Sequence, residues 1–358
     1  MKRTIETLVT AKKPREPKKK VALLMGFCGT KYQGMQVNPG TKTIEADLFK
    51  SLIKIGAVSE ENSECLQKIK FQRSCRTDKG VHAAGQVVSL KMILHSDSLE
   101  KLNRELPDDI RVYSIRKVIS SFNAKNNCDS RIYEYLMPSF VLKYSPLPKT
   151  EPMQESQEAN EEEFDEQYLE ACRNYRVSEE QLSQLNNILN QYVGSKMYHN
   201  FTINKKEGDD SCRRYIKSFK VIKKMDVKGQ EWIVMQVHGQ SFMMHQIRKM
   251  VGLAILLFKT GNENRPISEF FKASMINIPK APGIGLLLER ALFDNYNKKW
   301  NDRDQIEFDN AQLKALKEEL IYPQIFNNQL KLPFQNWLRC LDRHSYEYSY
   351  MEIKNSAK

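Results

Sequence analysis

Residues 76–94 read RTDKGVHAAGQVVSLKMIL, and this stretch joins an acidic turn to a strand. Asp78 stands in the turn, and Gly80 lets the chain bend tightly behind it. Over residues 86–94, apolar and polar side chains alternate with the period of two that is typical of a strand. We therefore expect Asp78 to lie in a loop that leads directly into the central sheet.

The surroundings of Asp78 along the chain are cationic. Arg76 and Lys79 flank the carboxylate, and neighbouring cations favour its ionised form and bring it close to any phosphate that binds there. The same composition also fits an ordinary surface turn with solvated ion pairs. The local sequence leaves both interpretations open.

Periodicity predicts further elements on both sides of this stretch. Strands are expected at 21–27, 111–118, 131–137, 214–223, 231–238 and 285–293, and helices at 43–56, 97–107, 178–194 and from about residue 242. Asp97 with Glu100, and Ser178 with Gln181, match the capping-box pattern at two of the helix starts. The order of elements predicts two similar halves.

The length of 358 residues favours two lobes, since a single core stops growing near about 250–300 residues. We expect a disordered basic tail over 1–19, a lobe carrying Asp78 over 20–145, and a second lobe over 178–297. The segment 146–177 is predicted to be an acidic linker, because positions 151–170 hold nine acidic and no basic residues. A helical extension, residues 298–358, is expected to pack on the second lobe.

The net charge is +12, with 56 Lys and Arg against 44 Asp and Glu, and the acidic linker masks an even more basic remainder. Such a surface suits a polyanion, above all nucleic acid. Improved solubility is the alternative explanation, and charge alone does not decide between them. The basic run at 12–20 resembles a nuclear-import signal, although a solvated tail has the same composition.

The seven cysteines have no C-x-x-C spacing, which indicates free thiols in a reducing compartment. The six histidines likewise lack ligand spacing, so no metal site is expected. No apolar run approaches the roughly 18 residues that cross a bilayer, and no membrane association is expected. The longest run, residues 251–258, is predicted to be a buried helix segment.

Two further segments carry residues of interest. In the stretch GQSFMMHQIRKMVG, residues 239–252, Arg248 and Lys249 interrupt an apolar helix. Either one of them is partly desolvated and paired with a carboxylate, or both extend to solvent, and this segment alone leaves the two interpretations open. In the strand at 131–137, Tyr133 and Tyr135 fall on the same face. Such rings can stack on unpaired bases or simply fill the core.

These segments occur together, and in this order, in one known family. The chain resembles the TruA-type tRNA pseudouridine synthases, in their eukaryotic pseudouridylate synthase 1 branch. The bacterial motif has tryptophan where this chain has Met35, which agrees with the eukaryotic branch. The matching stretches are 29–36, 71–90, 122–138, 214–215, 239–252, 279–283, 288–290 and 321–323.

The resemblance implies an isomerase that converts uridine to pseudouridine without a cofactor. Asp78 matches the family's catalytic aspartate, Tyr133 the tyrosine that stacks on the target base, and Arg248 the arginine that pairs with the aspartate. RNA contacts are expected from seven further residues: Arg76, Lys79, His82, Tyr32, Gln36, His245 and Lys249. The implied fold is α+β, with two ferredoxin/RRM-like lobes sharing a mixed, mainly antiparallel sheet around a central basic cleft, helices on the outer faces and a C-terminal helical extension.

The implied substrate is structured RNA, with tRNA first and snRNA and mRNA as further candidates. A monomer without an obligate protein partner is expected, located in the nucleus, with the cytoplasm and mitochondrion left open. The rival hypotheses are a non-catalytic RNA-binding protein or tRNA folding chaperone and, more distantly, a metal-dependent nuclease. A nuclease needs converging carboxylates, whereas the acidic residues here are concentrated in the linker.

Overall fold

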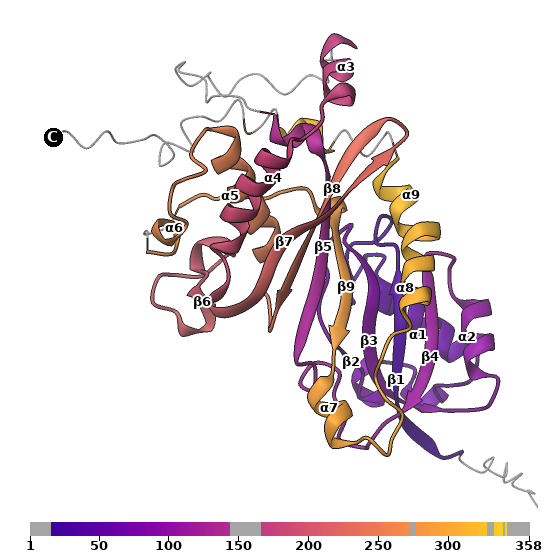
Figure 1. Cartoon of the computed structure of the whole chain (residues 1–358). Helices are drawn as coiled ribbons and strands as arrows, with labels where there is room; N and C mark the ends of the chain where they lie inside the picture. The colour runs from indigo at the N-terminus through magenta and orange to yellow at the C-terminus, as the bar shows by residue number, and fades with distance from the viewer. Residues whose placement is uncertain (1–15, 144–165, 273–275, 328–332, 339–340, 342–358) are drawn as a thin grey trace, which may run out of the picture.

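The computed structural model describes residues 16–143, 166–272, 276–327, 333–338 and 341. Within these residues one sheet runs through the molecule in the order β4-β1-β3-β9-β5-β8-β7-β6, with β2 paired to β3 (Figure 1). The strands are β1 Lys18–Phe27, β2 Gln72–Arg73, β3 His82–Ile93, β4 Ile110–Lys117, β5 Ser130–Pro138, β6 Gly194–Met197, β7 Arg213–Val227, β8 Gln230–Gly239 and β9 Leu286–Leu292.

The two halves of the chain meet at a parallel seam between β3 and β9. His82 pairs with Leu287 there and Ala83 with Leu288, whereas the other strand pairs of the described chain are antiparallel. Gly85 allows β3 and β9 to approach each other closely, since a Cβ atom at this position would lie 2.6 Å from the carbonyl oxygen of Glu289. The mixed, mainly antiparallel α+β fold predicted from the sequence is confirmed.

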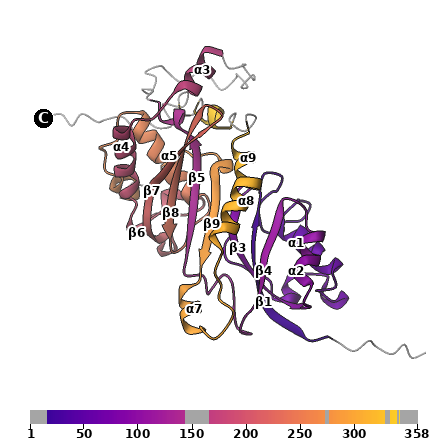
Figure 2. The same cartoon turned by 45° about the vertical axis from the view of Figure 1, so that its right-hand side comes forward.

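Helices lie at both ends of the sheet (Figure 1 and Figure 2). At one end α2 packs on β4 beside α1, and at the other α4 packs on β7 beside α5. The α-helices are α1 Ile44–Lys54, α2 Ser98–Glu105, α3 Glu166–Asn174, α4 Glu179–Asn190, α5 Gln246–Lys259, α6 Ser268–Lys272, α7 Asp294–Lys299, α8 Asn310–Leu316 and α9 Tyr322–Ile325. Single turns of 3₁₀ helix are η1 Glu60–Asn62, η2 Leu66–Ile69, η3 Ser139–Leu142, η4 His199–Phe201, η5 Asp210–Cys212 and η6 Gly283–Gly285, and η7, Lys317–Ile321, is a π-helical turn between α8 and α9.

The start of α5 corrects the sequence-based prediction. The helix was expected from about residue 242 but begins at Gln246, because His245 adopts a left-handed backbone with φ of 63°. From Gln246 onward the helix buries its apolar residues as predicted, including residues 251–258. The departure from regular helix therefore occurs at a residue that the resemblance singled out.

The two predicted capping boxes have different outcomes. Ser178 and Gln181 form the box at the start of α4, as predicted. At α2 the prediction is wrong, because Asp97 has φ of −95° and ψ of 4° and its side chain makes no capping hydrogen bond. An N-cap side chain needs an extended backbone to turn back on the helix, and the Asp97 carboxylate pairs instead with Lys101 at 2.8 Å.

The start of one strand and the presence of another also differ from the prediction. β1 begins at Lys18, inside the tail expected to be disordered, because residues 18–20 pair with residues 91–93 of β3 and a backbone ladder does not require apolar side chains. The short strand β6 was missed, since Gly194 starts it where a helix end was expected. Residues 1–15 lie outside the described chain.

The acidic linker falls mainly outside the described residues, which resume with α3 at Glu166. This helix occupies part of the segment predicted to be an irregular linker. The proposed division into 20–145, 146–177 and 178–297 stays a prediction.

The C-terminal extension does not confine itself to the second lobe, contrary to the prediction. α8 packs on β3, Leu316 lies against Gly26 of β1, and the ring of Phe308 meets Tyr113 of β4 edge-on at 6.3 Å. The chain leaves the sheet at β9, next to the seam, so the following helices lie across strands of both halves (Figure 2). The described part of the extension is largely helical, as predicted, and Leu313 and Leu316 of α8 are buried.

The extension also completes a buried group of charges, which we call the central ion cluster. It comprises Glu134 of β5, Glu289 and Arg290 of β9, Lys317 and Tyr322. Lys317 Nζ lies 3.1 Å from Glu134 Oε1 and 3.5 Å from Glu289 Oε1. The Tyr322 hydroxyl donates to Glu134 Oε2 at 3.2 Å, and Arg290 Nε donates to Glu289 Oε2 at 2.6 Å.

Candidate active site

Asp78 lies in the turn that precedes β3. Gly80 adopts a φ of 74° in this turn, and the Val81 N–H donates to the Asp78 carbonyl at 3.2 Å. The loop before α1 supports the turn, because the Met35 N–H donates to the Thr77 carbonyl at 3.3 Å. The Asp78 side chain is 28% exposed, so a well-held backbone presents a carboxylate that solvent can still reach.

Two side chains at the start of α5 approach the same oxygen of Asp78. His245 Nδ1 lies 2.8 Å from Oδ2, and Arg248 Nη1 lies 3.7 Å from it. We call these three residues the Asp78 cluster. His245 and Arg248 stand at the N-terminus of α5, and the positive end of a helix dipole also favours a negative charge such as that of Asp78. The sheet thus brings together two segments 167 positions apart around an acidic group.

Arg248 is held from behind by the loop at residues 279–283. Its Nε donates to the carbonyl of Ala281 at 2.7 Å, and the Ala281 N–H donates to the Arg248 carbonyl at 3.1 Å. Gly252 permits this packing, since a Cβ atom there would lie 1.9 Å from the Pro279 carbonyl oxygen. Burial lowers the pKa of Arg248, although Tyr135 and Asp78 oppose the shift, and a guanidinium remains charged in proteins.

Tyr133 lies in β5 between β8 and β9, and its side chain is buried. Its ring meets Phe242 edge-on at 5.3 Å, and its hydroxyl hydrogen-bonds to Cys75. Burial, followed by the proximity of Cys75, raises the pKa of Tyr133 well above its ordinary value. The phenol is therefore neutral at physiological pH. Its contact with Cys75 places Tyr133 beside the segment that carries Asp78.

Arg131 is a site residue that sequence reasoning missed. Its Nη2 donates to the Ser74 carbonyl at 2.8 Å and its Nη1 to the Gln240 carbonyl at 2.6 Å. It thus ties the segment before Asp78 to the segment before His245. The available signal was a charged residue at the start of a largely apolar strand, which suggests a buried guanidinium with carbonyl partners.

Known proteins of one family are similar to this chain. The sequence profile described as tRNA pseudouridine synthase matches residues 188–294. The chain is 36% identical to tRNA pseudouridine synthase 1 of Yarrowia lipolytica, covering 89% of this chain and 73% of the relative. It is 40% identical to the human pseudouridylate synthase 1 homolog, covering 91% of this chain and 74% of the relative. The chain belongs to the tRNA pseudouridine synthase family.

Membership confirms the predicted enzyme class, an isomerase that acts on uridines of tRNA, and does not favour the non-catalytic alternative. tRNA pseudouridine synthase 1 of Saccharomyces cerevisiae is 39% identical over 80% of this chain and 64% of its own length. The profile match includes Arg248 but not Asp78 or Tyr133. The longer alignments are therefore needed to relate the N-terminal half of the synthase to the family.

The residues predicted to contact RNA fall into two groups in the synthase. Arg76, Lys79 and Gln36 are exposed, and His245 and Lys249 are partly buried. The Lys249 ammonium donates to the carbonyls of Asn200 at 3.2 Å and Thr202 at 2.9 Å. Its desolvation, with Lys280 adding to the effect, lowers the pKa of Lys249.

Tyr32 and His82, by contrast, are buried and present almost no surface to a ligand. The Tyr32 hydroxyl donates to Asp47 Oδ2 at 3.1 Å, which fixes the loop that supports the Asp78 turn. His82 Nδ1 accepts the Gly29 N–H at 3.2 Å, and burial lowers its pKa to about 4. His82 is therefore a neutral hydrogen-bond acceptor inside the synthase at physiological pH.

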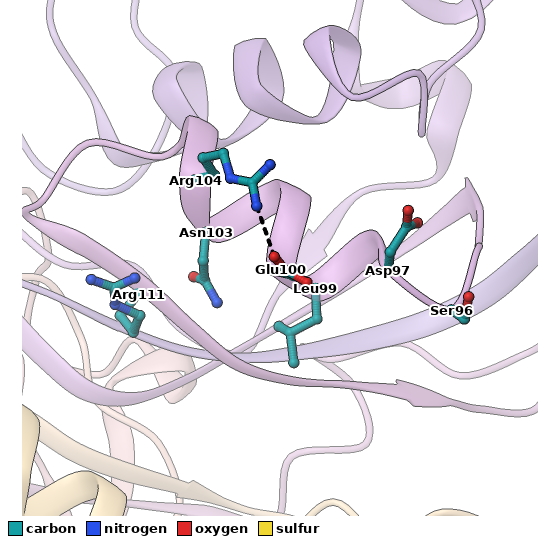
Figure 3. Close-up of a pocket in the computed structure, with 7 residues that line it drawn as sticks. All are labelled: Ser96, Asp97, Leu99, Glu100, Asn103, Arg104 and Arg111. Atoms are coloured by element: carbon teal, nitrogen blue, oxygen red, sulfur yellow. Dashed lines mark hydrogen bonds and ion pairs between the residues drawn. The ribbon is translucent and has the colours of Figure 1, made fainter.

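A separate hollow lies between α2 and β4 and contains no member of the Asp78 cluster (Figure 3). Arg104 Nη2 donates to Glu100 Oε1 at 2.7 Å, and Asn103 bonds both the N–H and the carbonyl of Val112. Its lining is Ser96, Asp97, Leu99, Glu100, Asn103, Arg104 and Arg111. These polar groups are largely engaged with one another or with the sheet, so the hollow offers little to a substrate.

The described residues contain no group of three or more His, Cys, Asp or Glu side chains that could hold a metal ion. In the same part of the chain, no helix is both long enough and apolar enough to cross a bilayer.

Proposed function

We propose that Asp78 is the catalytic carboxylate with which this synthase isomerises uridines in tRNA. The observation that carries the proposal is the meeting of Asp78 with Arg248, at 3.7 Å, across the two halves of the sheet. A partly exposed carboxylate beside a largely buried guanidinium is a typical catalytic arrangement, since the cation favours the ionised acid and the exposure gives access to a substrate.

The chemistry begins when the target uridine leaves the stack, which costs a few kcal/mol. Asp78 then acts on the ribose, and the C1′–N1 glycosidic bond breaks. The freed uracil turns and forms a C1′–C5 bond, after which the C5 proton is lost and N1 gains one. Substrate and product are isomers, so no group is transferred to another molecule and no redox change occurs.

Arg248 contributes by occupying the space next to Asp78 with a fixed positive charge. Its bond to the Ala281 carbonyl leaves the Nη atoms directed to the carboxylate side. A preorganised guanidinium can stabilise charge on the phosphate or on the developing transition state without reorganising during the reaction.

Tyr133 is proposed to stack on the freed uracil. Its raised pKa supports a neutral aromatic surface rather than a base that is ionised at physiological pH. Phe242 currently covers the ring edge-on, so a base that reaches Tyr133 has to displace this contact. The Phe242 segment leads directly into His245, which couples the arrival of a base to the start of α5.

The wider biology follows the charge of the chain. We propose tRNA as the first substrate, with snRNA and mRNA as further ones, and a monomer without an obligate protein partner. The net charge of +12 and the basic run at 12–20 support RNA binding and residence in the nucleus. Loss of nuclear signal on replacing the basic residues of that run, in a fluorescent fusion, is the expected result.

The catalytic assignment is tested with tRNA transcripts labelled with tritium at C5 of uridine. Asp78→Asn keeps the size of the side chain but removes its charge, and Asp78→Ala removes the carboxyl group. Both variants are expected to lose tritium release while RNA affinity stays nearly unchanged. Release at the wild-type rate by either variant would remove Asp78 from the mechanism.

A further inference from the structure

His245 combines an unfavourable backbone with a short contact to the catalytic carboxylate. Its φ of 63° and ψ of 0° place it in the left-handed region, which glycine and asparagine enter far more easily than other residues. Non-glycine residues in this region often mark functional sites. The position therefore requires an explanation beyond the start of a helix.

The side chain of His245 supplies that explanation. Its Nδ1 lies 2.8 Å from Asp78 Oδ2, closer than Arg248 Nη1 at 3.7 Å. An ionised carboxylate only accepts hydrogen bonds, so Nδ1 carries the proton in this contact. Among the described residues, both contacts of the carboxylate use Oδ2 and neither uses Oδ1.

The backbone on each side of His245 is fixed. The Met243 N–H donates to Gln246 Oε1 at 2.8 Å, and the Thr202 hydroxyl donates to the Met244 carbonyl at 2.9 Å. The His245 carbonyl accepts the Lys249 N–H at 3.0 Å. With its neighbours held in this way, the imidazole has little freedom to leave Asp78.

We propose that His245 is a positioning residue for Asp78. Its Nδ1–H holds Oδ2 and leaves Oδ1 directed to the ribose of the substrate. This assignment differs from the RNA contact predicted for His245 from the sequence, and it rests on the proposed function of Asp78. The left-handed backbone is the means by which the imidazole reaches the carboxylate from the first residue before α5.

Two substitutions separate the hydrogen bond from the backbone. His245→Gly and His245→Asn both tolerate positive φ, but only asparagine places an N–H donor where Nδ1 stands. The single-turnover rate constant is measured at saturating enzyme with C5-tritiated tRNA, and the dissociation constant of the same tRNA is measured separately. His245→Gly is expected to lower the rate constant roughly 100-fold, the effect of misplacing a reactive group by about 1 Å.

His245→Asn is expected to recover at least about tenfold of that loss, and both variants should bind tRNA nearly as well as the wild type. A glycine variant within threefold of the wild-type rate, or an asparagine variant no faster than glycine, overturns the proposal. If glycine destabilises the fold, His245→Asp replaces it, because aspartate has the shape of asparagine but cannot donate when ionised. Equal rates for the Asn and Asp variants likewise overturn it.

The His245 variants test the positioning role, whereas the Asp78→Asn variant tests the catalytic role of Asp78. A silent His245→Gly variant beside an inactive Asp78→Asn variant removes only the positioning role. An active Asp78→Asn variant removes the proposed function itself, whatever the His245 variants do.

Discussion

Two charge clusters lie toward opposite faces of β5, and their carboxylates differ in exposure and in contacts. On one face Glu134 belongs to the central ion cluster, in which Lys317 and Tyr322 contact both carboxylate oxygens and the Glu134 and Lys317 side chains are 5% and 13% exposed. On the other face Tyr133 lies near the segment that carries Asp78, whose carboxylate is 28% exposed and has contacts at Oδ2 alone among the described residues. The central ion cluster occupies both oxygens of Glu134, whereas the cluster that we propose to be catalytic leaves Oδ1 of Asp78 for the substrate.

Removing the Lys317 ammonium from the central ion cluster should produce the largest effect, and it should fall on stability. Lys317→Met leaves two buried glutamates short of a partner, and breaking such a buried pair costs about 3–5 kcal/mol in the free energy of unfolding. Urea denaturation followed by circular dichroism measures the loss.

Lys314→Met is the matched control for this change, three positions earlier in the same helical segment. Lys314 is 72% exposed and its contact with Glu318 is 3.9 Å long, so its removal should cost no more than about 1 kcal/mol. Equal losses for the two variants would mean that the central ion cluster contributes nothing specific.

The corresponding change in the Asp78 cluster should affect rate rather than stability. Arg248→Met preserves much of the buried stem but removes the charge, and loss of one preorganised donor lowers the rate about 100- to 1000-fold. Single-turnover tritium release measures the rate, and thermal unfolding monitors the fold. A variant with a normal rate but a much lower melting temperature would mean that Arg248 stabilises the fold and does not act in the reaction.

The smallest expected effect concerns the exposed cations that flank Asp78 along the chain. Arg76→Gln and Lys79→Gln each remove one charge from the surface. If both residues contact phosphates, each change should reduce the slope of log affinity against log salt by about 0.7–0.9. Filter binding of tRNA across a salt series provides the slope, and an unchanged slope would place the RNA elsewhere.

The elements of the fold were largely predictable because their signals are local. The alternation that placed Tyr133 and Tyr135 on one face of a strand is confirmed, since both lie in β5 in unbroken register with β8, opposite Val237 and Met235. The start of α5 was not predictable, because helical spacing continues through Met243 while His245 interrupts the helix through its backbone alone. Periodicity reads side chains and cannot detect a change of φ.

The candidate site was only partly predictable from residues. The local sequence left Asp78 undecided between a surface turn and a reactive carboxylate, and the family resemblance nominated it together with Arg248. The contact of Glu134 with Lys317 joins positions 183 apart, and no local pattern indicates such a pair. The burial of His82 was likewise hidden, because its neighbours in sequence include charged residues and glycines that are typical of a surface loop.

The parallel seam of the sheet has a consequence for biosynthesis. β3 gains its neighbour β9 only after the ribosome has made residues 286–288, so the turn bearing Asp78 spends much of translation beside a strand that has β1 on one side and an open edge on the other. Contacts between positions so distant in sequence form slowly, and an uncovered strand edge invites pairing with other chains. A nascent chain stalled before residue 286 should therefore depend on chaperones far more than one stalled after α9.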